Sequence, residues 1–437
     1  MKLYRNEWKN GIAYNHLATD RFKTGYFSIN FLLPLRAESA AYYALIPKLL
    51  LRGSRDYPNQ QAISRRLEEL YGADVLSRNF KRGEIQLVSM GIDILDNDYL
   101  PRDEEMDLLA ESIALLRSLL TDPCMENGHF CEEYTDGEIR NRILAIRAMI
   151  NNKQRLALEL CYRHMFENES AGVSTEGRIE DYETLDRDQL ATYYRRMLSE
   201  ARVEIFYVGG APRERVEELA KTVFSTVPRN GDSAMPSTLI RRSAEQMKYF
   251  EESTPTEQGI LVMGFRSGVV LHDDDHLALS LFNEIFGGSP ASKLFMNVRE
   301  AKSLCYYCSS FADLLKGTLF VVAGIDPQNK DVTLEEIQKQ LKEIQDGHID
   351  EEELTCAKQS LSNAYRSILD TPDGMESWYL RRFIGKMSDS PLENAKNLEK
   401  LTADDVSAVA RKLTPDTVFF LRGNGARPLC ATQEEEE

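Results

Sequence analysis

The sequence is short of several features, and each shortage excludes a class of protein. Its 437 residues contain no apolar run near the roughly 20 residues that a membrane-spanning helix needs. Its 53 Lys and Arg are outnumbered by 70 Asp and Glu, so it lacks the basic surplus that phosphate contacts require. Its first residues include no apolar stretch of the signal-peptide kind. We therefore expect no nucleic-acid partner, no membrane partner and a cytoplasmic location.

Cysteine is also scarce, and its arrangement does not favour a disulfide framework. The seven cysteines are odd in number and scattered, which fits reduced thiols. Cys305 and Cys308 have the C-x-x-C spacing, but they lie in a predicted strand, where alternation sends the two sulfurs to opposite faces. We interpret them as small core residues rather than a redox or metal pair.

The sequence contains an internal duplication. In each half a strand and a helix lead to a Gly-Ser pair, Gly53-Ser54 and then Gly288-Ser289, and a second helix follows. A Gly-Ile-Asp triplet closes a later strand in both halves, at 91–93 and at 324–326. The near-constant spacing predicts two homologous domains of α+β class, each a mainly antiparallel sheet covered by helices on one face.

The domain bounds follow from composition. The turn-rich stretch 229–243 predicts a linker between an N-terminal domain, 1–228, and a C-terminal domain, 244–425. The acidic residues 426–437 predict a frayed tail. Alternation and helical periodicity predict strands at 27–31, 86–90, 259–265 and 319–323, and long helices at 103–121, 128–167, 333–346 and 350–387.

The segment Ala44-Leu45-Ile46-Pro47-Lys48 has the frame of a metal-binding helix without its ligands. With the Gly53-Ser54 that follows, it resembles the inverted His-x-x-Glu-His region of the pitrilysin/insulinase-like (M16) peptidases. There, two histidines four apart on a helix bind one zinc, and the glutamate polarises the bound water. Ala44 and Lys48 hold the histidine positions here, and Pro47 holds the glutamate position. None of them suits zinc chemistry, and a proline inside a helix costs about 3 kcal/mol.

The stretch Gly287–Tyr306 resembles the C-terminal-domain signature of the same family, with Ser-x-Leu-Phe, Val-Arg-Glu and a tyrosine seven residues after the arginine. The resemblance implies that Arg299 and Tyr306 bind substrate opposite the zinc. A guanidinium can donate to a peptide carbonyl, and a tyrosine hydroxyl can stabilise an oxyanion. The alternative is that Arg299 makes a surface ion pair and Tyr306 is a core residue. Tyr307 should point to the other face.

The family's third ligand, a glutamate on a later helix, is also missing. The alignment places Leu144 and Ala145 at that position, with Glu132, Glu133 and Glu138 nearby. Without imidazoles at 44 and 48, none of these glutamates can build the site alone.

Two-domain members of the M16B type are known as pairs in which one subunit holds zinc and the other supplies the arginine and tyrosine. The resemblance therefore implies a half-clamshell of the LuxS/metallohydrolase-like fold that is not a peptidase alone and holds no cofactor. It would be the non-catalytic, substrate-binding subunit of a heterodimer whose partner has an intact His-x-x-Glu-His motif and the zinc. Its substrates would be extended, unfolded peptides, and the isolated chain can also form a homodimer.

Two other functions stay open at this point. One is a catalytically inert scaffold or peptide-binding protein of the same fold, and the other, independent peptidase activity, is disfavoured by the ligand positions. A further metal candidate is His272-Asp273-Asp274-Asp275-His276. Because this segment precedes an apolar helix, its aspartates are better interpreted as helix caps.

Overall fold

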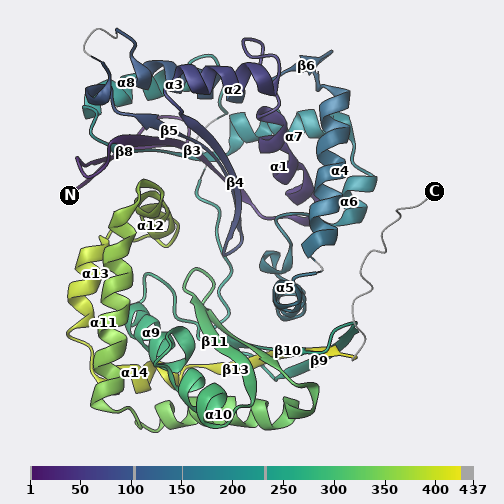
Figure 1. The fold of residues 1–437 in the computed structure, drawn as a ribbon, viewed down its shortest axis with the longest axis vertical. Coiled ribbons are helices and arrows are strands. Elements are labelled where there is room, and N and C mark those ends of the chain that lie inside the picture. The colour runs from purple at the N-terminus through teal and green to yellow at the C-terminus, as the bar shows by residue number, and fades with distance from the viewer. Residues whose placement is uncertain (1, 102–104, 150, 231–233, 425–437) are drawn as a thin grey trace. The chain divides into compact units, whose positions relative to one another are not determined.

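The computed structural model describes residues 2–101, 105–149, 151–230 and 234–424 (Figure 1). They form two compact units that are not contiguous in sequence. Unit 1 comprises Met1–Arg147, Val173–Thr238 and Ile368–Ile384, and unit 2 comprises Ala148–Gly172, Leu239–Ser367 and Gly385–Glu437. Each unit therefore takes one segment from the other half of the sequence, which contiguous bounds of 1–228 and 244–425 do not anticipate. The predicted tail at 426–437 lies outside the described residues.

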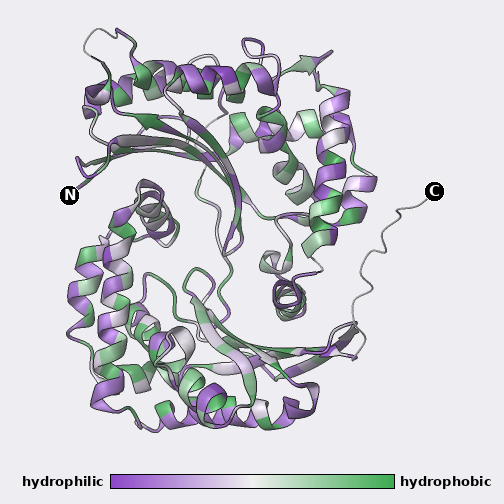
Figure 2. Ribbon diagram, viewed as in Figure 1, coloured by the Kyte–Doolittle hydropathy of each residue, from purple (hydrophilic) through white to green (hydrophobic). Residues whose placement is uncertain are grey.

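The sheet of unit 1 has six strands. They are β1 (Leu3–Glu7), β2 (Ile12–Ala18), β3 (Thr24–Pro34), β4 (Asp74–Arg82), β5 (Ile85–Leu95) and β8 (Arg202–Gly209), in the order β1-β2-β8-β3-β5-β4. Only the pairing of β2 with β8 is parallel among them. β3, β5 and β8 are buried over nearly their whole length, and they bury polar residues such as Ser28, Asn30 and Glu204 among the apolar ones (Figure 2).

Helices pack on this sheet around a common apolar core. They are α1 (Ala37–Leu50), α2 (Gln60–Glu69), α3 (Leu108–Thr121), α4 (Glu132–Met149), α6 (Ile179–Glu183), α7 (Arg187–Glu200) and α8 (Arg213–Val223). Helix α1 continues through Pro47, which has no N–H to donate. Leu45, Ile46 and Leu49 are buried in the core around it, and burying each such side chain contributes roughly 1.5–3 kcal/mol. Core packing thus offsets the cost of the proline.

Unit 2 repeats the plan with five strands. They are β9 (Lys248–Thr254), β10 (Gly259–Arg266), β11 (Cys305–Asp313), β12 (Thr318–Ile325) and β13 (Thr414–Gly423), in the order β11-β12-β10-β13-β9. Its helices are α5 (Lys153–Met165), α9 (His276–Asn283), α10 (Lys330–Gln345), α11 (Glu351–Ser367), α13 (Pro391–Leu398) and α14 (Ala403–Ala410), with π-helical segments η3 (Glu284–Gly288) and η4 (Leu294–Ala301). The mixed α/β class with two mainly antiparallel sheets is confirmed.

The exchanged segments add a helix to the second face of each sheet, which the expectation of one covered face omitted. Helix α5 packs on β10 and β13 of unit 2, and α12 (Pro372–Ile384) packs on β8 and β3 of unit 1 (Figure 1). Two long predicted helices are accordingly split. The run 128–167 divides into α4 and α5, where Asn152 caps α5. The run 350–387 divides into α11 and α12, where Pro372 begins α12.

No helix among the described residues is long and apolar enough to cross a membrane.

A buried carboxyl group attaches α12 to unit 1. Glu376 is fully enclosed, and its Oε1 accepts hydrogen bonds from the Ser28 hydroxyl and, at 2.6 Å, from Asn30 Nδ2 on β3. Burial raises the pKa of Glu376, while the two hydrogen bonds act in the opposite direction without cancelling it. Folding therefore favours the protonated form of Glu376 more than the unfolded chain does.

This raised pKa predicts a pH-dependent stability. A raised pKa contributes stability that is complete below the unfolded value, 4.5, and is lost as pH rises through the folded pKa. As pH rises from 4.5 through the folded pKa, we expect Glu376→Gln to gain stability relative to the wild type, by about 1.4 kcal/mol for each unit by which folding raises the pKa. Urea unfolding of both proteins across that range measures the difference. A difference that does not change with pH would contradict the prediction.

Candidate functional site

The three positions that correspond to zinc chemistry lie on the second half of α1. Ala44 and Pro47 are buried, and Ala44 has no exposed surface. Lys48, in the last turn, is half-buried, and its Nζ donates to Ser77 Oγ on β4 at 3.2 Å. Pro47 therefore belongs to the core of unit 1, and only Lys48 presents a functional group beside the sheet.

A second cation lies against the same helix. Arg142 on α4 donates to the Ala44 carbonyl oxygen at 3.4 Å and to Glu176 Oε2 at 2.5 Å. Burial lowers the pKa of Lys48, and Arg142 lowers it further, while Glu138 and Glu176 act in the opposite direction. An ammonium and a guanidinium thus occupy the region where the resemblance implies a metal.

The residues present do not fit zinc. Ala44 has no donor atom, Lys48 is a cation, and no group of three His, Cys, Asp or Glu in the described parts of the chain can hold a metal ion. The aligned third-ligand positions, Leu144 and Ala145, lie on the exposed side of α4, and Leu144 is 60% exposed.

Glu138 and Arg142 of α4 make polar contacts with α1 and with the residues just after it. Glu138 accepts from Arg52 Nε at 2.6 Å, just past the end of α1, while Arg142 contacts Ala44 one turn further along α4. Their spacing of four residues was the only sequence signal for this face, because residues four apart lie on one side of a helix. Glu176 was missed because it comes from a loop far along the chain.

Arg299 lies in the last turn of η4, at the surface of unit 2. Its side chain is 40% exposed, with Nε 3.5 Å from Glu300 Oε1 and the guanidinium 4.6 Å from the centre of the Phe295 ring. An exposed ion pair at that distance stabilises a conformation by less than about 1 kcal/mol. Arg299 is therefore free to reorient toward a ligand at little cost.

Tyr306 lies in a β-bulge at the start of β11. Cys305 pairs with Ile325 and Tyr307 pairs with Gly324, so Tyr306 is an extra residue in the strand. β11 is an edge strand, and Tyr306 is 58% exposed, so it is not the core residue of the alternative interpretation. No described hydrogen bond or ring contact joins Arg299 and Tyr306, although both lie at the junction of η4 and β11.

The neighbouring tyrosine has a different environment. The Tyr307 ring packs over Gly324, where a Cβ would lie 2.3 Å from a ring carbon, and it borders the core beneath α5. Burial raises the pKa of Tyr307 to about 12. The prediction that Tyr307 points away from Tyr306 agrees with this placement, and the pair provides a matched control.

The bulge corrects the interpretation of Cys305 and Cys308. The extra residue shifts the alternation, so both thiols lie on the buried side of β11, with exposures of 9% and 4%. The interaction with Cys308 lowers the pKa of Cys305, an effect that burial opposes and Arg299 reinforces. The same interaction, together with burial, raises the pKa of Cys308. The sulfurs are therefore not on opposite faces, because a bulge interrupts the period of two.

The segment 272–276 leads into α9, but its aspartates are not the side-chain caps that we expected, because Asp275 at the N-cap makes no cap hydrogen bond. His272 is exposed and His276 is buried, with its Nδ1 2.8 Å from the Asp273 carbonyl oxygen. Asp273 Oδ2 accepts from the backbone N–H of Val270, and Asp275 accepts from Lys412 at 2.6 Å. Asp273, Asp275 and His276 thus each have a local structural partner.

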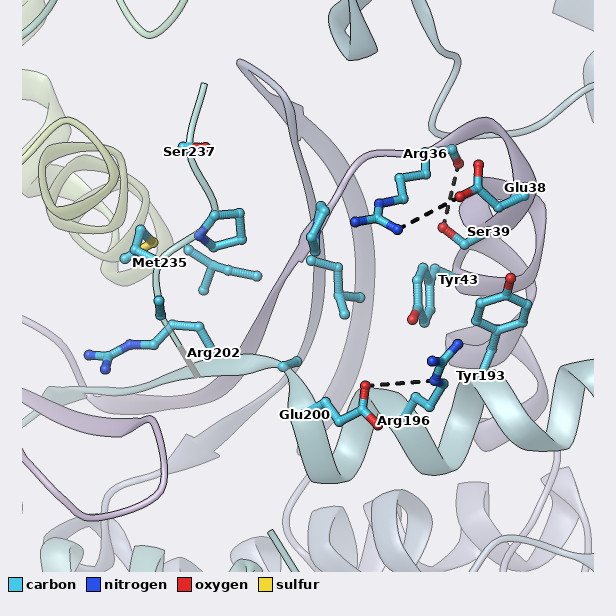
Figure 3. Close-up of a pocket in the computed structure, with 16 residues that line it drawn as sticks. Arg36, Glu38, Ser39, Tyr43, Tyr193, Arg196, Glu200, Arg202, Met235 and Ser237 are labelled. Atoms are coloured by element: carbon cyan, nitrogen blue, oxygen red, sulfur yellow. Dashed lines mark hydrogen bonds and ion pairs between the residues drawn. The ribbon is translucent and has the colours of Figure 1, made fainter. Parts of the chain in front are cut away.

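A separate pocket of about 690 Å³ lies at the other end of α1 (Figure 3). Arg36 and Glu38 line one side, 3.9 Å apart, and Arg196 and Glu200 line another, 3.6 Å apart. The edge-on ring of Tyr193 packs on Tyr43, with ring centres 5.4 Å apart. Arg202 also lines the pocket, and it is paired with Glu7 and Glu204 outside the lining, so each arginine of the pocket already has a carboxylate partner.

Fold and site together define a class: a two-unit α/β protein built like a metallopeptidase, with other residues in place of the metal ligands. Residues 184–361 match the family described as the peptidase M16 inactive domain. The chain is 28% identical to the probable inactive metalloprotease YmfF of Bacillus subtilis over 96% of this chain and 98% of that protein.

Solved structures agree with this match. A conserved protein from Enterococcus faecalis superposes with a TM-score of 0.89 and 28% identity, over 98% of this chain and 100% of that one. An M16 inactive domain from Pseudomonas fluorescens shares the fold, with a TM-score of 0.76 and 17% identity over 98% and 100%. The chain is therefore similar over nearly its whole length to M16 peptidase homologues, including proteins described as inactive.

Proposed function

We propose that this chain is the non-catalytic, substrate-binding subunit of a heterodimeric M16 zinc peptidase that acts on unfolded peptides. In this proposal a partner with an intact His-x-x-Glu-His motif holds the zinc, and Arg299 and Tyr306 of this chain complete the active site. The observation that carries the proposal is a contrast within one chain. The metal positions are filled by Ala44, Pro47 and Lys48, whereas the arginine and tyrosine remain exposed.

The exposed pair has the chemistry that substrate binding requires. A guanidinium donates two hydrogen bonds in a fixed plane, which suits a peptide carbonyl, and a phenol can donate to the oxyanion formed during hydrolysis. Bulges are frequent beside active sites because they redirect a side chain out of the regular pleat. The bulge at Tyr306 is such a device on an edge strand to which an extended peptide can add.

A catalytically inert scaffold or peptide-binding protein is the second candidate. The absence of a fitting metal site in the described residues supports it equally. The exposed tyrosine in the bulge favours the subunit, because a scaffold gains nothing from a large exposed ring there. A cytoplasmic location is part of the proposal, supported by the free thiols of the six cysteines that the structure describes.

Reconstitution tests the proposal directly. We expect an unstructured fluorogenic peptide library to be cleaved by a mixture of this chain and a zinc-motif M16 protein from the same genome, and by neither alone. A zinc chelator should abolish the activity of the mixture. A demonstrated complex without activity, beside an active control peptidase, would favour the scaffold. Activity and stoichiometric zinc in the pure chain would instead indicate an independent peptidase.

A further inference from the structure

Lys48 is a cation without a carboxylate partner. Its Nζ donates to the neutral Ser77 hydroxyl at 3.2 Å, and no carboxylate oxygen of the described residues lies within the 4.0 Å of an ion pair. The side chain is half-buried between α1 and β4. An ammonium in that position has lost part of its hydration without gaining an anion in return.

The carboxylates that influence Lys48 are already paired elsewhere. Glu138 accepts from Arg52 Nε at 2.6 Å, and Glu176 accepts from Arg142 at 2.5 Å. These two arginines and Lys48 carry three positive charges, against two negative charges on the glutamates, so the cluster has a surplus of one positive charge. One external carboxylate would balance it.

The surplus positive charge lies beside a strand to which an extended peptide can bind. Ser77, the hydrogen-bond partner of Lys48, lies on β4, one of the two edge strands of the unit 1 sheet. An edge strand offers a row of backbone donors and acceptors, and an extended chain adds to it as a further strand. A peptide along β4 would pass beside Lys48.

We propose that Lys48 binds a carboxylate of an extended peptide lying along β4, so that an anion site replaces the metal site of the family. The inference rests on the proposed function, because it assigns the charge class of the peptide that the subunit binds. A peptide's C-terminal carboxylate and an acidic side chain offer the same chemistry, and the experiment separates them.

The test uses the full chain and four ten-residue Ser/Ala/Leu peptides that carry an N-terminal dansyl group. The first pair differs only in a C-terminal carboxylate or amide. The second pair is amidated and differs only in a central Glu or Gln. We expect one carboxylate peptide to bind about tenfold more tightly than its neutral match, as a charge-assisted hydrogen bond allows. The pair that shows the preference identifies the source of the carboxylate.

Variants of the chain test whether Lys48 causes the preference for the carboxylate peptide. Lys48→Met should abolish it while leaving the affinity for the neutral peptides unchanged, and Lys48→Arg should retain most of it. Lys9→Met, which removes an exposed lysine of the same unit, should have no effect. The inference is overturned if the wild type does not distinguish the members of either pair, or if Lys48→Met keeps the preference.

The experiments distinguish a failure of the anion site from a failure of the proposed function. An active reconstituted pair together with no carboxylate preference would overturn the anion site alone. Failure of the wild type to bind any of the four peptides, together with an inactive pair, would overturn both.

Discussion

Replacing Glu169 with glutamine should lower the free energy of unfolding of unit 2 by about 3–5 kcal/mol, because it removes the carboxylate that pairs with the buried Lys316 and one of the two carboxylates that pair with the buried Arg266. Glu169 follows α5, the exchanged helix, and is 8% exposed. Its Oε1 accepts from Arg266 at 3.0 Å, its Oε2 pairs with Lys316, and Arg241 lies 3.2 Å away. Arg266 and Lys316 are almost fully buried, so neither can be rehydrated in place.

Asp416 cannot compensate for the loss. It accepts from Arg266 Nε at 2.7 Å and has no described ion pair with Lys316. Urea unfolding followed by circular dichroism measures the effect as a lower midpoint at an unchanged slope. Glu335→Gln, an exposed position on α10, should change stability by no more than about 0.5 kcal/mol. Equal midpoints for Glu169→Gln and wild type would show that the charge does not hold α5 to the sheet.

The Glu169 carboxylate should also make the stability of the folded chain sensitive to acid. Burial alone would raise the pKa of Glu169, but the hydrogen bonds from Lys316 and Arg266 outweigh it and lower the pKa. A lowered pKa contributes stability that is present above the unfolded value, 4.5, and is lost as pH falls through the folded pKa. Below that range the wild type should approach the stability of Glu169→Gln.

The sequence predicted the strands better than the partners of the helices. The four strand segments predicted from alternation fall within β3, β5, β10 and β12, because a buried strand has a distinct local pattern. Helix α5 buries Ala157, Leu160, Cys161 and Met165, and this pattern shows that one face is covered. It does not show which sheet covers it, so the exchange of α5 and α12 was missed.

The features of the candidate site that depend on residue type alone could be predicted from the sequence. The features that depend on contacts between distant parts of the chain could not. The loss of ligands at Ala44 and Lys48 is visible in the residue types alone. The bulge at Tyr306 depends on the register of β11 against β12, which no local pattern specifies. The contact of Arg142 with Ala44 joins helices about 100 residues apart, so the resident cations appear only in three dimensions.

Changing Arg299 to Ala together with Tyr306 to Phe should reduce the kcat of the assembled pair by about 10²–10³-fold, the cost of removing an oxyanion donor. The zinc content of the pair should not change, because the metal is proposed to belong to the partner. Both side chains are exposed, and phenylalanine keeps the ring of Tyr306, so the folded structure should persist. Peptide hydrolysis by the purified complex, with size-exclusion chromatography to verify assembly, measures the effect.

Tyr307→Phe is the matched control, since it removes the same hydroxyl group one residue away. The Tyr307 ring packs over Gly324, and its hydroxyl is buried, so its loss should leave kcat within about twofold of the wild type. If the variant at Arg299 and Tyr306 assembles and keeps full activity, these residues do not act on the substrate, and the inert scaffold becomes the better account. If Tyr306→Phe alone lowers kcat while Tyr307→Phe does not, the exposed hydroxyl of Tyr306 acts at the reacting carbonyl, because both changes remove the same group and only that of Tyr306 is exposed.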